Sequence, residues 1–123
     1  MKVLIVDDSQ IMRRIIVGLL KKAGVEDVAE AADGKEALDL LSQDKQIGLV
    51  LLDWNMPVMS GIDTLRSIRT TNRTLPVVMI TTESEKERVV EAIKAGANDY
   101  LLKPFRPDDI LCKLQKHLQT TAR

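Results

Sequence analysis

Short aliphatic runs that each stop at a polar side chain recur along this chain of 123 residues. Between them, apolar residues recur every three or four positions, which is typical of one face of an amphipathic helix. Because parallel strands need a crossover connection, usually a helix, this alternation predicts an α/β fold with a parallel sheet. The four clearest runs, with the polar residues that follow them, are 3–6 with Asp7 and Asp8, 49–52 with Asp53, 77–80 with Thr81 and Thr82, and 100–102 with Lys103.

A fifth run, at 27–32, is more polar, which predicts an edge strand, whereas the strongly apolar run at 49–52 predicts the central one. Five strands and five helices in alternation, joined by right-handed crossovers, predict a doubly wound, three-layer sandwich. Helix boundaries are predicted from residues that commonly cap them, namely Ser9, Asp33 with Glu36, Gly24, Gly96 and Pro107.

Apolar residues at helical spacing also predict which helix faces are buried. In the first helix these residues are Met12, Ile15, Ile16, Leu19 and Ala23. In the fourth helix they are Val89, Val90, Ile93 and Ala97, and in the last helix Ile110, Leu111, Leu114 and Leu118.

Length and charge narrow the class of protein. A chain of 123 residues fits one domain, expected to span 1–123 with no second domain. Lys plus Arg and Asp plus Glu both number 18, so no basic field favours nucleic acid. No apolar stretch approaches the roughly 20 residues that cross a bilayer, and the chain begins without a signal-peptide pattern. With the single cysteine Cys112, these features predict a cytoplasmic protein.

The polar residues after the strands should meet at one edge, because ligands of open α/β sheets bind outside the carboxyl ends of the strands. Asp7, Asp8 and Asp53 would then repel one another, and two unit charges about 4 Å apart repel by about 4 kcal/mol at an effective dielectric near 20. Either one carboxyl stays protonated or a hard cation relieves this repulsion, and oxygen-only ligands favour Mg²⁺ as that cation.

Metal-assisted phosphoryl chemistry suits such an edge. Asp53, alone after the most apolar strand, is the candidate nucleophile toward an activated phosphoryl group. Lys103 offers a positive charge for the carboxylates and for phosphate oxygens, and the Thr81 hydroxyl can donate to a phosphoryl oxygen.

These residues resemble the receiver domain of two-component response regulators. The motifs are Asp7-Asp8, Asp53 with the following Trp-Asn-Met-Pro and Met-Ser-Gly, Thr81, and Lys103-Pro104-Phe105. The resemblance covers the whole chain and implies the flavodoxin-like strand order 2-1-3-4-5, which is known for this fold class and is not dictated by the residues alone. Asp-Trp-Asn-Met-Pro at 53–57 and Tyr100, three residues before Lys103, are similar to the single-domain chemotaxis (CheY) type.

Site roles follow from the resemblance, residue by residue. Asp53 is implied as the phosphoacceptor, and Mg²⁺ is implied on Asp7, Asp8, Asp53 and the backbone carbonyl of Asn55. Thr81 and Tyr100 are implied as a switch pair. Asn55, Thr82 and Glu83 are expected to influence hydrolysis of the phosphoryl group. Trp54, beside the acceptor, is expected to be partly exposed and to report on the site.

The resemblance also implies partners. A histidine kinase would donate the phosphoryl group, and the chain would catalyse only its own phosphorylation and dephosphorylation, without being an enzyme for other substrates. The fourth helix, the strand of Tyr100 and the last helix would form the output face. A flagellar motor switch protein is the candidate partner there, a phosphatase is a further one, and the protein is expected to be a monomer.

Other functions remain open at this point. A phosphate sink or relay receiver outside chemotaxis would carry the same residues. A haloacid-dehalogenase-like phosphatase also uses a nucleophilic Asp with Mg²⁺, but it would want an acid where Asn55 stands. A flavodoxin-like carrier would want a Ser, Thr and Gly-rich loop in place of Asp7-Asp8.

Overall fold

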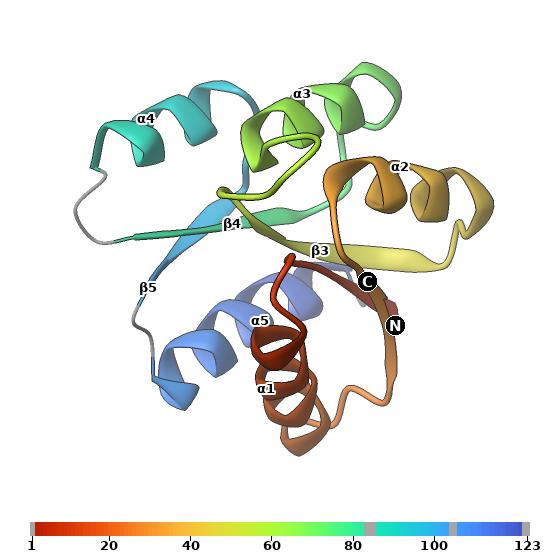
Figure 1. Ribbon diagram of the computed structural model, residues 1–123. Coiled ribbons are helices and arrows are strands. Elements are labelled where there is room, and N and C mark those ends of the chain that lie inside the picture. Colours follow the sequence, from red (N-terminus) through yellow and green to blue (C-terminus); the bar gives the residue numbers. More distant parts are fainter. Residues whose placement is uncertain (1, 83–85, 104–105, 122–123) are drawn as a thin grey trace.

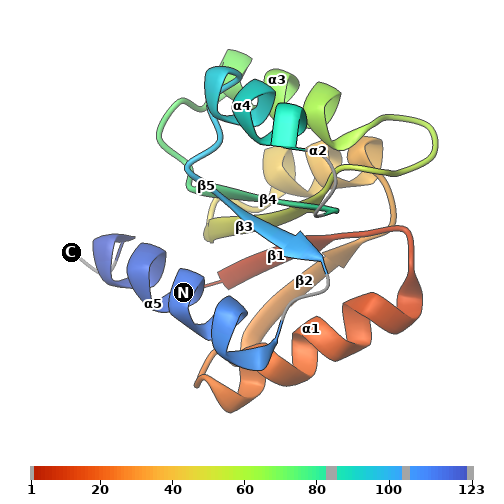
Figure 2. The same ribbon diagram turned by 90° about the vertical axis from the view of Figure 1, so that its left-hand side faces the viewer.

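Five parallel strands form one twisted sheet with helices against both faces (Figure 1). The computed structural model describes residues 2–82, 86–103 and 106–121. Helices α1 and α5 cover one face, and α2, α3 and α4 cover the other, as the perpendicular view also shows (Figure 2). The elements are β1 (Lys2–Val6), α1 (Gln10–Lys22), β2 (Asp27–Ala31), α2 (Gly34–Gln43), β3 (Ile47–Asp53), α3 (Gly61–Thr71), β4 (Val77–Thr82), α4 (Lys86–Lys94), β5 (Asp99–Lys103) and α5 (Pro107–Thr121).

The strand order is β2-β1-β3-β4-β5, which confirms the flavodoxin-like prediction. The polar strand β2 lies at an edge and the apolar strand β3 lies at the centre, both as expected. After β1 the chain moves outward to β2 and then returns to the other side of β1 at β3. This reversal places a crevice at the carboxyl ends of β1 and β3, where doubly wound folds bind ligands.

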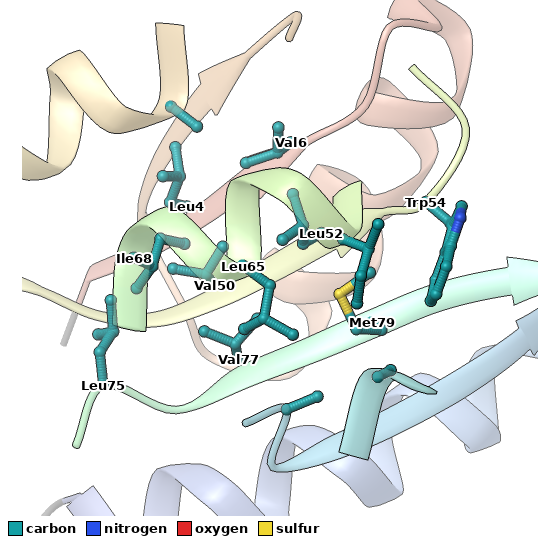
Figure 3. Packing of buried hydrophobic residues seen from close by; sticks show 14 of the residues in the cluster. Leu4, Val6, Val50, Leu52, Trp54, Leu65, Ile68, Leu75, Val77 and Met79 are labelled. Carbon is teal, nitrogen blue, oxygen red and sulfur yellow. The ribbon is translucent and has the colours of Figure 1, made fainter. Parts of the chain in front are cut away.

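Each face of the sheet has its own hydrophobic core. Leu4 and Val6 of β1 pack toward α2 and α3, whereas Val3 and Ile5 pack toward α1 and α5. Figure 3 shows the first core, in which side chains of β1, β3 and β4 meet those of α3. Burial of one such aliphatic side chain stabilises the fold by about 1.5–3 kcal/mol. The two cores therefore hold the strand ends of the crevice in fixed register.

Local capping chemistry sets several helix ends as predicted. The backbone N–H of Met12 donates to Ser9 Oγ (3.2 Å), and the N–H of Glu36 donates to Asp33 Oδ1 (2.8 Å). The short loop that leads from β1 into α1 is thereby fixed just beyond the first acidic pair.

The apolar pattern was only partly right about the helix faces. In α1 the structure buries Ile16, as predicted, and also Leu20, whereas Ile15 is exposed. For the fourth helix the prediction is right for Ala97, which is buried, and Val89 is half-buried. Val90 and Ile93 were wrongly assigned to the core, because they are 55% and 48% exposed. Residues advance about 100° around a helix, so these two cannot share the face of the buried Ala92.

The last helix follows its prediction more closely. Pro107 is its first residue, and Ile110 and Leu114 are fully buried. Leu118 lies outside the side chains that the structure describes. With 15 residues, α5 is the longest helix. No helix in the described ranges combines the length and apolar character needed to cross a bilayer.

Candidate functional site

The parallel register brings the predicted polar residues to one end of the sheet. Val6 pairs with Leu52, so Asp7 leaves β1 beside Asp53 at the end of β3. Asp53 pairs with Ile80, which places Thr81 one residue beyond it on β4. The neighbouring pairs of β4 and β5 are Thr81 with Leu102 and Thr82 with Lys103.

Three carboxylates converge at this end. Asp7, Asp8 and Asp53 each offer one oxygen, and these oxygens all lie within 4.8 Å of one another. Asp7 and Asp53 are only 1% and 4% exposed, whereas Asp8 is exposed to solvent. The predicted convergence of the three acids is therefore present in the structure.

Burial makes the charged form of these acids costly. Desolvation, followed by repulsion from Asp7, raises the pKa of Asp53 to about 6, although Lys103 opposes the rise. Desolvation also raises the pKa of Asp7, against a lowering hydrogen bond from the backbone of Ser9. Strongly shifted acids in a cleft commonly mark functional sites.

Lys103 is the cation inside this cluster. Its Nζ lies 3.3 Å from Asp53 Oδ1 and 3.7 Å from Asp7 Oδ2. Asp7 Oδ1 accepts a hydrogen bond from the Ser9 N–H (2.8 Å), but Asp7 Oδ2 receives none within the described residues. One ammonium therefore faces two buried carboxylates, which leaves excess negative charge in the pocket.

The donor set fits Mg²⁺. The carboxylates are hard oxygen ligands, one of them has a buried oxygen without a hydrogen bond, and Mg²⁺ typically binds one or two carboxylates together with water and phosphate. Asp7, Asp8 and Asp53 could hold it, with the backbone carbonyl of Asn55 as the further ligand that the resemblance implies.

Thr81 and Tyr100 lie on adjacent strands. Thr81 is buried, and its Oγ1 has no hydrogen-bond partner in the described part of the chain. An unpartnered buried hydroxyl beside an acidic pocket is suited to donate to an incoming oxygen. Tyr100 is half-buried on β5, and Lys113 Nζ lies 5.2 Å from the centre of its ring.

Of the three residues expected to influence hydrolysis, Asn55 is the one whose side chain the structure describes. Asn55 is exposed, and its Oδ1 accepts a hydrogen bond from Arg88 of α4 (2.8 Å). The backbone of Thr82 ends β4, but its side chain and the whole of Glu83 lie outside the described residues.

Trp54 differs from its prediction. Its side chain was expected to be partly exposed, but the residue is only 6% exposed and packs in the core next to α3. Its backbone N–H donates to the Ile80 carbonyl (3.0 Å), which continues the pairing with β4 one residue beyond Asp53.

Three residues near the site were not assigned a role from sequence. Arg13 of α1 donates to the Asp7 backbone carbonyl (2.6 Å) and pairs with Glu30 of β2 (3.0 Å). Gly61 is the glycine of the Met-Ser-Gly motif, and a Cβ there would overlap the backbone carbonyl of Asp53. Arg88 is remote in sequence, and no local pattern could have revealed its contact with Asn55.

Comparison with known proteins agrees with this geometry. A model of the family described as response regulator receiver domain matches residues 3–115. Chemotaxis protein CheY1 of Helicobacter pylori (strain J99) is 46% identical over 122 residues, covering 98% of both chains. Chemotaxis protein CheY of Pseudomonas aeruginosa is 45% identical over 118 residues, covering 94% of each.

Solved structures agree as well. Chemotaxis protein CheY4 of Vibrio cholerae superposes with a TM-score of 0.86 at 37% identity, covering 94% of this chain and 97% of that one. A probable two-component response regulator/GGDEF domain protein gives a TM-score of 0.93 at 33% identity, but this chain spans only 51% of its length. The chain belongs to the response regulator receiver domain family and is homologous to the CheY chemotaxis regulators.

Proposed function

We propose that this protein is a single-domain response regulator that accepts a phosphoryl group on Asp53 from the phosphohistidine of a histidine kinase. The observation that carries the proposal is the convergence of Asp7, Asp8 and Asp53 within 4.8 Å, with Lys103 Nζ 3.3 Å from Asp53. Phosphoryl transfer asks a protein mainly for positioning and charge neutralisation, and these groups supply both.

The transfer forms a bond between an Asp53 carboxylate oxygen and phosphorus while the phosphorus–nitrogen bond of the donor breaks. Asp7, Asp8, Asp53 and the Asn55 carbonyl would hold Mg²⁺, which supplies charge neutralisation when bound. Lys103 lies close enough to move from the Asp53 carboxylate to a phosphoryl oxygen, and the buried hydroxyl of Thr81 can donate to another. Water later cleaves the acyl phosphate, so the protein catalyses only its own phosphorylation and dephosphorylation.

The output would be contact with another protein. In our proposal Thr81 and Tyr100 form the switch pair, and α4, β5 and α5 form the output face. The exposed apolar side chains of Val90 and Ile93 on α4 support a binding role for this face. The relatives named chemotaxis proteins support a role in chemotaxis. In our proposal the partner is a flagellar motor switch protein, and the protein acts as a cytoplasmic monomer.

Labelling with a small acyl phosphate tests the acceptor. In the presence of Mg²⁺, radiolabelled acetyl phosphate should give an acid-stable, base-labile label that chelation prevents and that Asp53→Asn abolishes. Asp39→Asn, which changes an exposed acid on α2, is the matched control and should label normally. Label that persists in Asp53→Asn would move the acceptor elsewhere.

A further inference from the structure

Helix α4 is attached to the rest of the protein by few side chains. Among its described residues Ala92 is buried and Val89 is half-buried, while Val90 and Ile93 are largely exposed. A helix with so small an apolar anchor depends on its polar contacts for its position. Within the described residues these contacts include one from Arg88 to the loop after β3 and an ion pair between Glu91 and Arg66 of α3 (2.9 Å).

Arg88 contacts both residues that directly follow Asp53. Its Nη1 donates to Asn55 Oδ1 (2.8 Å), and its Cζ lies 5.1 Å from the centre of the Trp54 ring. A guanidinium is planar and can stack on a ring while donating in its own plane, which a lysine ammonium cannot do. The two contacts together fix both the position and the orientation of the group.

The loop that Arg88 contacts is tied to the site through its backbone. The Trp54 N–H bonds to the Ile80 carbonyl of β4 (3.0 Å), and the Gly61 N–H bonds to the Trp54 carbonyl (2.8 Å). Asn55 and Arg88 also line one open depression with Asp8. A change of charge at Asp53 therefore acts on a short segment that backbone hydrogen bonds hold in place and that Arg88 connects to α4.

We propose that Arg88 is a positioning residue that couples the phosphoryl state of Asp53 to the position of helix α4, through its contacts with Asn55 and Trp54. The inference rests on the proposed function and adds to it the side chain that carries the signal out of the site. Coupling between sites is reciprocal, so a partner that holds α4 also changes the affinity of the site for a phosphoryl group.

Beryllofluoride, an analogue of the phosphoryl group, tests the coupling without turnover. Uptake is followed by fluorine NMR in the presence of Mg²⁺, and the response of α4 by hydrogen exchange of the amides of residues 86–94. In the unmodified protein, uptake should change the exchange rates of these amides. In Arg88→Ala uptake should persist, because Asp7, Asp8, Asp53 and Lys103 are unchanged, while the change in exchange falls by roughly 2- to 30-fold.

Matched variants separate this role from general loosening of α4. Arg66→Ala removes the ion pair between α3 and α4 and should keep the response. Arg88→Lys keeps the charge but should lose most of the response. An unchanged response in Arg88→Ala, or an equal loss in Arg66→Ala, overturns the inference. If the unmodified protein takes up beryllofluoride without any response of α4, only the inference about Arg88 is overturned. If it takes up none, the proposed function is overturned as well.

Discussion

The ammonium of Lys103 lies 3.3 Å from Oδ1 of Asp53, across the carboxyl ends of strands β3 and β5. It stands where an incoming phosphoryl oxygen would also need a positive partner. The same ammonium opposes the binding of a second cation, because both stabilise the same carboxylates.

Replacing Lys103 by Met should therefore separate metal binding from phosphorylation. Mg²⁺ should bind several-fold more tightly, because a competing positive charge has left the cluster. Phosphorylation by acetyl phosphate should slow by about 100-fold, as is typical when one charge-stabilising group is removed. Calorimetry and labelling rates give the two values, and Lys35→Met, on the exposed side of α2, is the control. A loss of both properties together would mean that Lys103 supports the fold of the pocket.

The pKa of Asp53, raised by burial to about 6, predicts an unusual pH dependence. The folded state takes up this proton at higher pH than the unfolded chain, so without Mg²⁺ the free energy of unfolding should increase as the pH falls from 7 to 5. Asp53→Asn should weaken this dependence, leaving the part that Asp7 contributes, and stabilise the metal-free protein at pH 7.5 by up to about 3 kcal/mol. Urea unfolding with a chelator measures both effects. Saturating Mg²⁺ should abolish the stability gain of Asp53→Asn over the unmodified protein. A flat pH profile in the unmodified protein would contradict the prediction.

Asp99 should have the opposite effect on stability. Its burial favours the neutral form, but hydrogen bonds from Lys113, the Tyr100 N–H and His117 outweigh this and lower its pKa to about 2. Asp99→Asn should destabilise the protein by about 2–3 kcal/mol at pH 6. The loss should shrink as the pH falls from about 4 to 2, where the folded carboxylate itself becomes protonated. Chemical unfolding at pH 6 and pH 3 measures the change, and a constant difference would rule out the charge as its cause.

Two glycines give a matched pair of alanine substitutions. Gly61→Ala should destabilise the protein by more than about 2 kcal/mol and weaken Mg²⁺ binding, because the new Cβ would overlap the Asp53 carbonyl. Gly18→Ala, inside α1, meets nothing within 4 Å and should stabilise it by up to about 1 kcal/mol. Thermal unfolding of both variants tests this, and equal effects would show that the backbone beside Asp53 adapts.

Much of the sheet was predictable from sequence, because the more apolar a run is, the closer to the centre of the sheet its strand is expected to lie. The polar run at 27–32 gave the edge strand β2, and the apolar run at 49–52 gave the central strand β3. Convergence of Asp7, Asp8 and Asp53 followed from parallel pairing alone. The strand order itself came from the family resemblance.

What could not be predicted depends on contacts between distant segments. Ala92 rather than Val90 faces the sheet, because the orientation of α4 is set by its neighbours and not by its own most apolar residues. Likewise, Arg88 reaches Asn55 across 33 positions of sequence. No periodicity or spacing encodes such a contact.

Strand β5 carries Lys103 at one end and Asp99 at the other, four residues apart. The rise of a strand separates these ends by about 13 Å. Lys103 of the proposed phosphoryl site and the buried, ion-paired carboxylate of Asp99 thus lie at opposite ends of one strand. Substitutions around Asp99 can therefore be used to change stability while Asp7, Asp8, Asp53 and Lys103 stay as they are.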